Sequence, residues 1–279
     1  MRYWLAALVV LCGLSSAAQG AQLAIIIDDV GYNRALGERT ARLPGAYTLA
    51  LLPDTPHSQF LAQLGHQQHK ELMLHAPMAS LGGLKLGPGA LTLEMSRADF
   101  VSSLRQSIAQ IPHIKGINNH MGSALTSQFQ AMGWTMTEAR RAGLYFVDSR
   151  TTASSIAFST AQAYGLPSAS RDIFLDHEKD RAAIWRQLKR AVALAQKRGH
   201  AIAIGHPYPE TLDVLEAASG QWLEQQGIEL VAASSLVRRA IPGTLTCPAP
   251  PVLLRQRSGY FFAQNSPQTA NILPSLRNL

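Results

Sequence analysis

Short apolar runs alternate with longer amphipathic stretches along most of this chain. The short runs hold consecutive aliphatic residues, as in 201–204, which favours strands buried on both faces of a parallel sheet. The longer stretches have the spacing of helices that cover such a sheet. Predicted strands span 23–28, 46–52, 71–75, 114–118, 143–147, 172–175, 200–204 and 228–232, and predicted helices 34–43, 56–67, 96–110, 128–142, 155–164, 179–198 and 209–226. We therefore predict an α/β fold, a seven- or eight-stranded (β/α) barrel forming a single domain.

The two ends of the chain depart from this alternation. Residues 1–20 carry a basic residue, an apolar stretch over 4–14 and then small residues, which is the order of a secretory signal peptide. The apolar stretch is too short to span a bilayer, so we predict export to the periplasm or beyond and no stable membrane span after cleavage. The barrel is predicted over 21–242, followed by a proline-rich, poorly ordered tail over 243–279.

Composition excludes several function classes. The formal net charge of +7 suggests an acidic or polyanionic neighbourhood, but lysines and arginines are scattered and no basic patch is interleaved with aromatic residues. We therefore predict no nucleic-acid partner. No serine-hydrolase elbow, phosphate-binding glycine loop or dinucleotide fingerprint occurs, and Cys247 has no plausible base beside it.

Polar residues gather where the predicted strands end, which is where (β/α) barrels carry their chemistry. The clearest group is the pair Asp28 and Asp29, directly after an aliphatic run. Adjacent carboxylates repel each other unless a cation or a transferable proton separates their roles. One acid could bind a metal while the other activates water, whereas the alternative, a helix cap, needs only one acid.

Three histidines also stand at predicted strand ends. His75 and His120 are candidate metal ligands, with a hydrogen-bonded core histidine and a polar turn as the respective alternatives. His57 is a rival for a third ligand position, several residues beyond its strand. His206 lies in a loop stiffened by two prolines, which suits a general acid, although it could equally be a structural residue at a helix start.

Asn119 and Asp148 are weaker candidates at two further strand ends. An amide beside His120 could fix the tautomer of that imidazole or grip a polar substrate. Asp148 could orient a catalytic histidine or hold substrate hydroxyls, or it could simply be neutralised by Arg150.

Four segments, 25–32, 74–78, 118–123 and 205–207, together resemble the motifs of the divergent polysaccharide deacetylases, relatives of the nodulation-type carbohydrate esterases. The resemblance covers about 22–240. It implies a distorted (β/α) barrel that binds a divalent metal, usually zinc, through one aspartate and two histidines, and that removes an acetyl group from an amino sugar. Matched by position, Asp28 is the base that activates water, Asp29 the metal-binding acid and His206 the general acid.

The chain departs from the ordinary deacetylase pattern at the histidine ligands. Ordinary members take both from one His-x-x-x-His stretch, but here Ala79 stands four residues after His75 and Ala124 four residues after His120. We therefore expect the two metal-binding histidines to come from two strands, as His75 and His120.

Taken together, these features predict an exported metal-dependent hydrolase that deacetylates an N-acetylated amino-sugar polymer, a polysaccharide or a peptidoglycan-type glycan. Asn119 and Asp148 would position sugar hydroxyls. The alternative is a non-catalytic periplasmic protein that binds a glycan or a protein partner. The missing His-x-x-x-His pattern favours this binder, whereas retention of Asp28 and His206 favours the enzyme.

Overall fold

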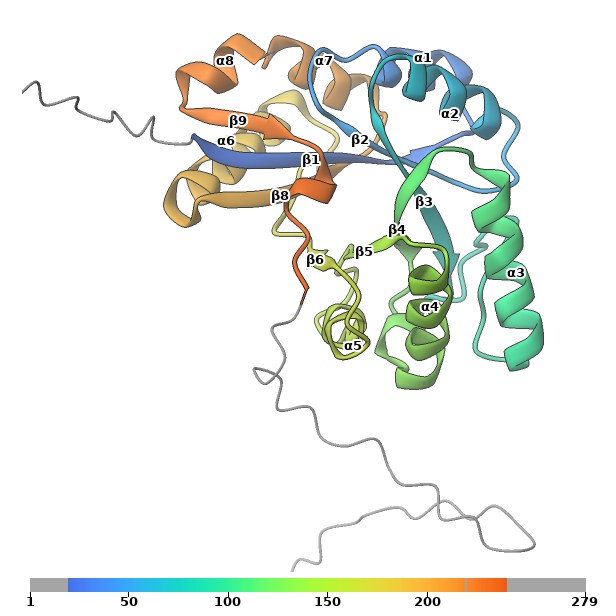
Figure 1. The fold of residues 1–279 in the computed structure, drawn as a ribbon. Helices are drawn as coiled ribbons and strands as arrows, with labels where there is room; N and C mark the ends of the chain where they lie inside the picture. The colour runs from blue at the N-terminus through green and yellow to red at the C-terminus, as the bar shows by residue number, and fades with distance from the viewer. Residues whose placement is uncertain (1–19, 219, 240–279) are drawn as a thin grey trace, which may run out of the picture. The chain divides into compact units, whose positions relative to one another are not determined.

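The apolar runs form the strands of one parallel sheet in the computed structural model, which describes residues 20–218 and 220–239 (Figure 1). The predicted signal peptide up to residue 19 and the predicted tail over 243–279 lie outside the described residues. The strands are β1 (Ala21–Val30), β2 (Thr48–Leu51), β3 (Glu71–Met78), β4 (Ile114–Met121), β5 (Tyr145–Asp148), β6 (Ser168–Ser170), β7 (Ile173–Phe174), β8 (His200–Gly205) and β9 (Ile228–Val231).

The sheet curls into a distorted barrel. Its strands follow the order β6-β5-β4-β3-β2-β1-β8-β7, and β9 pairs with the first half of β1, on the edge that β2 uses further along. All of these pairings are parallel. The end strands β6 and β7 follow one another in the chain, separated by Arg171 and Asp172. Covalent continuity, rather than a strand pairing, therefore joins the two ends of the sheet.

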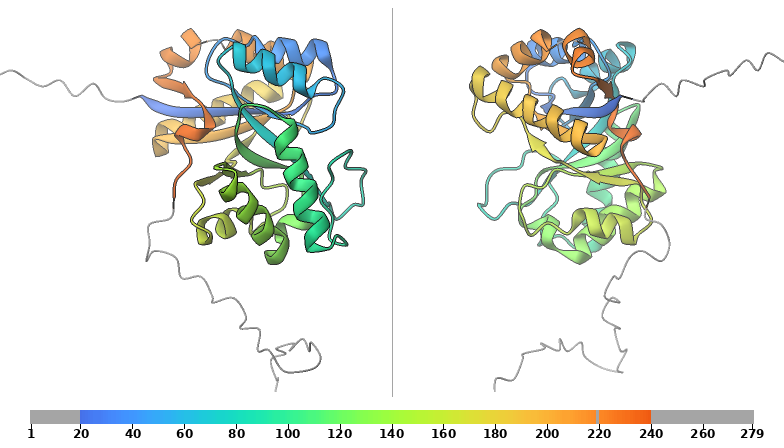
Figure 2. Two further views of the ribbon diagram at one scale, coloured as in Figure 1. Left: turned by 45° about the vertical axis from the view of Figure 1, so that its right-hand side comes forward. Right: turned by 90° about the vertical axis from the view of Figure 1, so that its left-hand side faces the viewer.

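Helices cover the outside of the curled sheet, and they are α1 (Arg34–Ala41), α2 (Ser58–Gln67), α3 (Arg97–Gln110), α4 (Phe129–Arg141), α5 (Ala157–Ala163), α6 (Arg181–Arg198), α7 (Pro209–Ala217) and α8 (Gly220–Gln225). Helices α1, α2, α7 and α8 gather at one side and α3, α4 and α5 at the other (Figures 1 and 2). Side-chain oxygens of Asn33, Ser96 and Asp180 accept hydrogen bonds from backbone amides in the first turns of α1, α3 and α6. Within the described ranges, no helix combines the length and apolarity needed to cross a membrane.

Two apolar layers result from the alternation of side chains along the strands. In β1, Leu23, Ile25 and Ile27 pack outward against the helices, whereas Ala24 and Ile26 belong to a second cluster inside the barrel. Both layers are fully buried, which explains why the strands are apolar at consecutive positions. Which layer a strand-end residue joins therefore depends on whether its position is odd or even along the strand.

The predicted barrel is confirmed, with two local differences. The short strand β6 was not predicted, since its residues, Ser-Ala-Ser, carry no strand pattern; only its pairing with β5 makes it a strand. The single helix predicted over 209–226 is two helices, α7 and α8. Gly220 begins the second, and glycine is a poor residue for a helix interior.

Gly31 supports the turn directly after the two acids, and its φ of 147° favours glycine. A Cβ at this position would collide with Thr55 Oγ1. We predict that Gly31→Ala lowers the free energy of unfolding by about 1–3 kcal/mol, measured by urea titration. Gly143→Ala is the matched control, because Gly143 also has a positive φ but its Cβ would meet open space. Equal losses in both variants would show that the collision is unimportant.

Candidate active site

The inner face of the barrel positions most of the candidate catalytic side chains. Asp28 continues the inward series Ala24 and Ile26, and His75 lies two residues beyond the inward Met73. On β4, Asn118 pairs in register with His75, and His120 lies two residues further on the same face. His206 likewise follows the inward Ile204 of β8. Strand alternation therefore directs these side chains toward one another at the carboxyl end of the sheet.

Asp29 joins this group only because the backbone of β1 breaks its alternation. Consecutive residues of a regular strand point to opposite faces, so Asp28 and Asp29 should diverge. The pairing with β2 has one extra residue between Ile27 and Val30, and Asp29 has a left-handed backbone with φ of 56°. As a result Asp29 Oδ1 lies 3.2 Å from His75 Nε2, while Asp28 Oδ2 approaches the same nitrogen at 3.7 Å.

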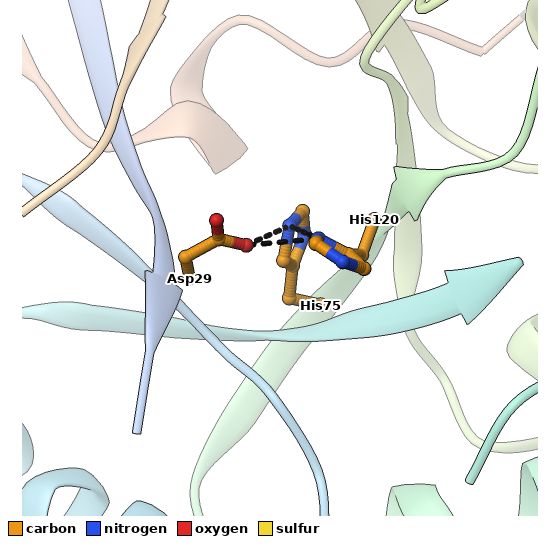
Figure 3. Close-up of side chains that lie close together, drawn as sticks. All are labelled: Asp29, His75 and His120. Carbon is orange, nitrogen blue, oxygen red and sulfur yellow. Dashed lines mark hydrogen bonds and ion pairs between the residues drawn. The ribbon is translucent and has the colours of Figure 1, made fainter. Parts of the chain in front are cut away.

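Three potential ligand atoms converge at this point (Figure 3). Asp29 Oδ1 lies 2.8 Å from His120 Nδ1 and 3.2 Å from His75 Nε2, and the two nitrogens are 3.2 Å apart. Asp29 Oδ1 is buried and has no partner with hydrogen-bonding geometry among the described residues. Two imidazole nitrogens and one carboxylate oxygen this close together are an arrangement that one divalent cation can bridge.

The donor set fits a divalent metal ion such as zinc. Two imidazoles and one carboxylate, with a position left for water or substrate, are characteristic of catalytic zinc. Tetrahedral ligands at zinc bond lengths lie about 3.3 Å apart, close to the separations found here. Burial alone would raise the pKa of Asp29, but the neighbouring imidazoles of His120 and His75 outweigh it and lower the pKa. The Asp29 carboxyl therefore stays ionised, as a metal ligand must.

The pKa of the His75 imidazole reflects the negative charge of Asp28 and Asp29. Burial would lower the pKa of its imidazole, but Asp28 and Asp29 raise that pKa to about 9. A nitrogen that holds a proton this firmly lies where a cation is electrostatically favoured. Metal binding must then displace this proton, since only neutral imidazole coordinates.

Asn118 links the proposed base to a proposed ligand. Its amide nitrogen donates to Asp28 Oδ1 at 2.7 Å, and its amide oxygen lies 2.7 Å from His75 Nδ1. This oxygen can only accept, so Nδ1 carries the proton of the neutral ring, and Nε2 is the nitrogen whose lone pair can bind a metal once its own proton is displaced. Our sequence prediction missed this role, although Asn118 lies two residues before His120 and therefore on the same strand face.

Asp28 is the deeply buried acid of the pair, with 3% of its surface exposed. Burial raises the pKa of its carboxyl, while His75, His206 and the Asn118 amide act in the opposite direction. A carboxylate with a raised pKa accepts a proton more readily than an exposed aspartate. This property suits a general base.

His206 is held by a second buried acid, Asp176. Asp176 Oδ1 lies 2.9 Å from His206 Nδ1, and its Oδ2 accepts hydrogen bonds from the His206 backbone amide at 2.5 Å and from Thr211 Oγ1 at 2.8 Å. Burial would lower the pKa of His206, but Asp176 together with Asp28 and Asp29 outweighs burial and raises the pKa. The ring presents Nε2 toward the centre, 3.8 Å from Asp29 Oδ2. Our sequence prediction did not include this pair, because Asp176 and His206 lie in different loops.

The site opens into a cleft of about 410 Å³. Asp28, His75, His120 and His206 form its floor, so substrate in the cleft could reach each of them. Its other lining residues come from the end of β4, the segment after β5 and the segments in and around β7, and are Asn119, Met121, Ser149, Arg150, Thr151, Arg171, Phe174 and His177.

Asn119 and Asp148 lie on the helix-facing side of their strands. The Asn119 amide donates to the backbone oxygen of Met121 and accepts from the Ser149 amide. Asp148 accepts from Ser155, from the Phe158 amide at the start of α5 and from the Arg150 amide. Their contact with sugar hydroxyls stays a prediction, and the observed bonds favour a role in holding the surrounding loops.

His57, the rival third ligand, does not join the metal-binding group found among the described residues. It stands at the start of α2, beyond the carboxyl end of β2. The ligand set His75 and His120, drawn from two adjacent strands, is the one that the geometry brings together with Asp29.

Solved structures share the fold. An uncharacterized protein from Agrobacterium tumefaciens C58 matches with a TM-score of 0.76 and 26% identity, over 80% of this chain and 91% of that one. The catalytic domain of peptidoglycan N-acetylglucosamine deacetylase from Eubacterium rectale matches with a TM-score of 0.51 and 11% identity, over 80% and 93% of the two chains. At that identity the second match shows the barrel alone.

Sequence relatives and a family model give the assignment. The uncharacterized protein YibQ of Escherichia coli K12 is 38% identical over 87% of this chain and 75% of its own length. An uncharacterized protein of Haemophilus influenzae is 37% identical over 84% and 81% of the respective chains. The model of the divergent polysaccharide deacetylases matches residues 25–237, which include all the candidate site residues named above. This chain therefore belongs to the divergent polysaccharide deacetylase family.

Proposed function

We propose that this protein is an exported, zinc-dependent hydrolase that removes acetyl groups from an N-acetylated amino-sugar polymer. The observation that carries the proposal is the convergence of Asp29, His75 and His120 beside two further groups suited to proton transfer. A scaffold that only binds glycans needs no such arrangement of a buried base and an acid with its own carboxylate partner. Membership of the deacetylase family supports the same reaction class.

Asp29, His75 and His120 would hold the metal. A divalent cation bound there would polarise the acyl carbonyl and lower the pKa of the attacking water. The protein contributes the ligand orientation, since Asn118 fixes the His75 tautomer and the bulge in β1 aims Asp29.

Asp28 and His206 divide the proton transfers. Asp28 accepts a proton from water as it attacks, and its burial makes the carboxyl basic enough for this. His206, kept protonated by Asp176, donates from Nε2 to the departing amine. The two groups come from the adjacent strand ends of β1 and β8, so both border the same reacting centre.

The proposed substrate is an envelope glycan. The cleft is of a size that suits small-molecule groups such as sugar units, and polar side chains dominate its lining. The structural neighbour from Eubacterium rectale is the catalytic domain of a peptidoglycan N-acetylglucosamine deacetylase. The signal-like residues 1–20 support export to the periplasm or the medium, where such polymers occur.

The two adjacent acids should be separable by mutation. We predict that Asp29→Ala abolishes zinc binding and turnover, because it removes a ligand. Asp28→Asn should keep zinc but reduce kcat at least about 100-fold, because the amide cannot accept the proton. Zinc content is measured by atomic emission. Turnover is measured as the release of acetate from chitin oligomers and from peptidoglycan. Asp54→Asn changes an exposed acid outside the cleft and is the matched control.

Two outcomes of this experiment would overturn parts of the proposal. Full activity in Asp28→Asn would remove the proposed base. Wild-type protein with neither zinc nor acetate release on any acetylated glycan would favour the non-catalytic binder.

Asn118→Leu should weaken zinc binding by about 10–100-fold, because it frees the His75 ring and leaves Asp28 without its amide partner. Calorimetric titration of the folded apo-protein with zinc measures this. Thr135→Val is the control for general destabilisation, since it removes a buried hydroxyl from α4 outside the cleft. An unchanged zinc affinity in Asn118→Leu would show that the amide does not orient the ligand.

The Asp176–His206 pair predicts a change in pH dependence. Asp176 raises the pKa of His206, whose ring also faces Asp28, Asp29 and Tyr208. Asp176→Asn removes one of the negative charges, so this pKa falls and the proton is lost at lower pH. In the zinc-loaded enzyme, the alkaline limb of the kcat/KM profile should therefore move to lower pH. A reduced rate with an unmoved limb would mean that Asp176 only supports the fold.

A further inference from the structure

One wall of the cleft is unusually rich in positive charge. It consists of the segment 149–151 after β5, together with Arg171, Phe174 and His177 around β7. Arg150, Arg171 and His177 all border the cleft, whereas Asp28 is the one carboxylate among the lining residues. We call Ser149, Arg150 and Arg171 the cationic wall. The proposed chemistry gives none of these three residues a task.

Arg171 is a half-buried cation whose position is fixed. Its Nε donates to the backbone oxygen of Ser149 at 2.7 Å, and its Nη2 to that of Arg150 at 2.9 Å. The guanidinium carbon lies 5.1 Å from the centre of the Phe174 ring. These contacts hold the side chain without supplying a full negative charge. Within 20–218 and 220–239, no carboxylate lies within ion-pair distance of Arg171.

Arg150 has an unusual backbone for its residue type. Its φ of 48° is left-handed, which is uncommon outside glycine, asparagine and aspartate, and its amide is tied to Asp148 Oδ1 at 2.8 Å. The side chain is exposed and borders the cleft, and it too has no ion-pair partner in the described part of the chain. A strained backbone that places a second arginine at the same wall is a feature typical of ligand sites.

Ser149 adds an independent observation. Ser149 is 5% exposed and borders the cleft, yet its hydroxyl has no hydrogen-bond partner among the described residues. Buried hydroxyls normally find a partner, so the missing one points to a group supplied by a ligand.

The acids around this wall are engaged elsewhere. Asp148 accepts bonds from the loop and from the start of α5, and Asp172 pairs with Arg198 at 3.3 Å. Glu178 lies 3.9 Å from Arg186. Asp28, the remaining acid that faces the cleft, accepts from Asn118. Asp28, Asp148 and Asp172 attract Arg171 through space, but none of the described acids forms an ion pair with Arg150 or Arg171. The cationic wall therefore keeps arginine N–H donors available to a carboxylate that enters the cleft.

We propose that the cationic wall binds a carboxylate carried by the substrate, so that the enzyme prefers acidic amino-sugar polymers over neutral ones. This inference rests on the proposed function and narrows its substrate class. Arginine matches a carboxylate because its planar fork of N–H donors fits the two oxygens. The carboxylate could belong to a uronic acid residue or to a lactyl ether on the amino sugar, and both offer the same chemistry to the wall.

The test compares substrates that differ only in charge. One pair is the N-acetylglucosamine–N-acetylmuramic acid disaccharide repeat and its carboxamide; the other is an oligomer alternating N-acetylglucosamine with glucuronic acid and its carboxamide. For the zinc-loaded wild type, amidation should lower kcat/KM about tenfold or more for at least one pair. The pair that responds identifies the source of the carboxylate. Equal rates for acid and amide in both pairs would overturn the inference.

Variants connect this preference to the cationic wall. Arg150→Ala and Arg171→Gln should each reduce the preference for the acid form, and the double variant should bring it to within about twofold of unity. Arg190→Ala is the matched control, because it removes an exposed arginine of α6 outside the cleft lining. Arg171 also ties the backbone of residues 149 and 150, so folding is checked by Tm. A preference unchanged in the double variant, or lost equally in Arg190→Ala, would contradict the assignment.

A binding measurement separates this inference from the proposed reaction. Calorimetry of zinc-loaded Asp28→Asn protein with each acid and amide pair gives a Kd ratio that requires no turnover. A binding preference for the acid forms, together with no acetate release by the zinc-loaded wild type, would support the cationic wall while the hydrolase proposal fails. Acetate release with no charge preference in rate or binding would leave the hydrolase standing and overturn the cationic wall.

Discussion

The left-handed backbone at Asp29 is the constraint on which the site depends. A regular strand would send Asp28 and Asp29 to opposite faces of the sheet. The extra residue in β1 and the φ of 56° bring both carboxyls to His75 Nε2 instead. Aspartate tolerates this conformation better than most residues, so the residue that can bind the metal can also adopt the turn. Gly31 then carries the chain away with a φ that favours glycine.

The other site residues need no such break, because ordinary alternation already points them inward. His75, Asn118, His120 and His206 extend the inner layer that Met73 and Ile204 begin. The same rule turns Asn119 and Asp148 toward the helices, where backbone groups and α5 occupy their polar atoms. At the carboxyl ends of the strands, inward-facing residues therefore form the candidate active site, whereas Asn119 and Asp148 face the helices and make hydrogen bonds that hold the loops.

Buried polar pairs organise the charge of the centre. Asn118 joins Asp28 to His75 and thereby fixes one tautomer, and Asp176 joins His206 and raises the pKa of its imidazole. Each buried acid has specific partners, as the energetic cost of burying charge requires. Asp29 Oδ1 is the exception, and it is the atom at which the donor set converges. On the far wall, Arg150 and Arg171 supply positive charge and form no ion pair with any described acid.

The sequence by itself determined the architecture and most of the candidate groups. Eight of the nine strands and the (β/α) alternation followed from buried aliphatic runs and amphipathic spacing, since these patterns reflect local periodicity. The acid pair and the histidines could be named because they end such runs. The family resemblance already grouped Asp29 with His75 and His120, and the tertiary structure brings their ligand atoms together. Tertiary structure alone decided that Asp176 serves His206 and that Asn118 bridges two strands. These relations depend on register, on a β-bulge and on contacts between distant segments, and no local pattern of residues encodes them.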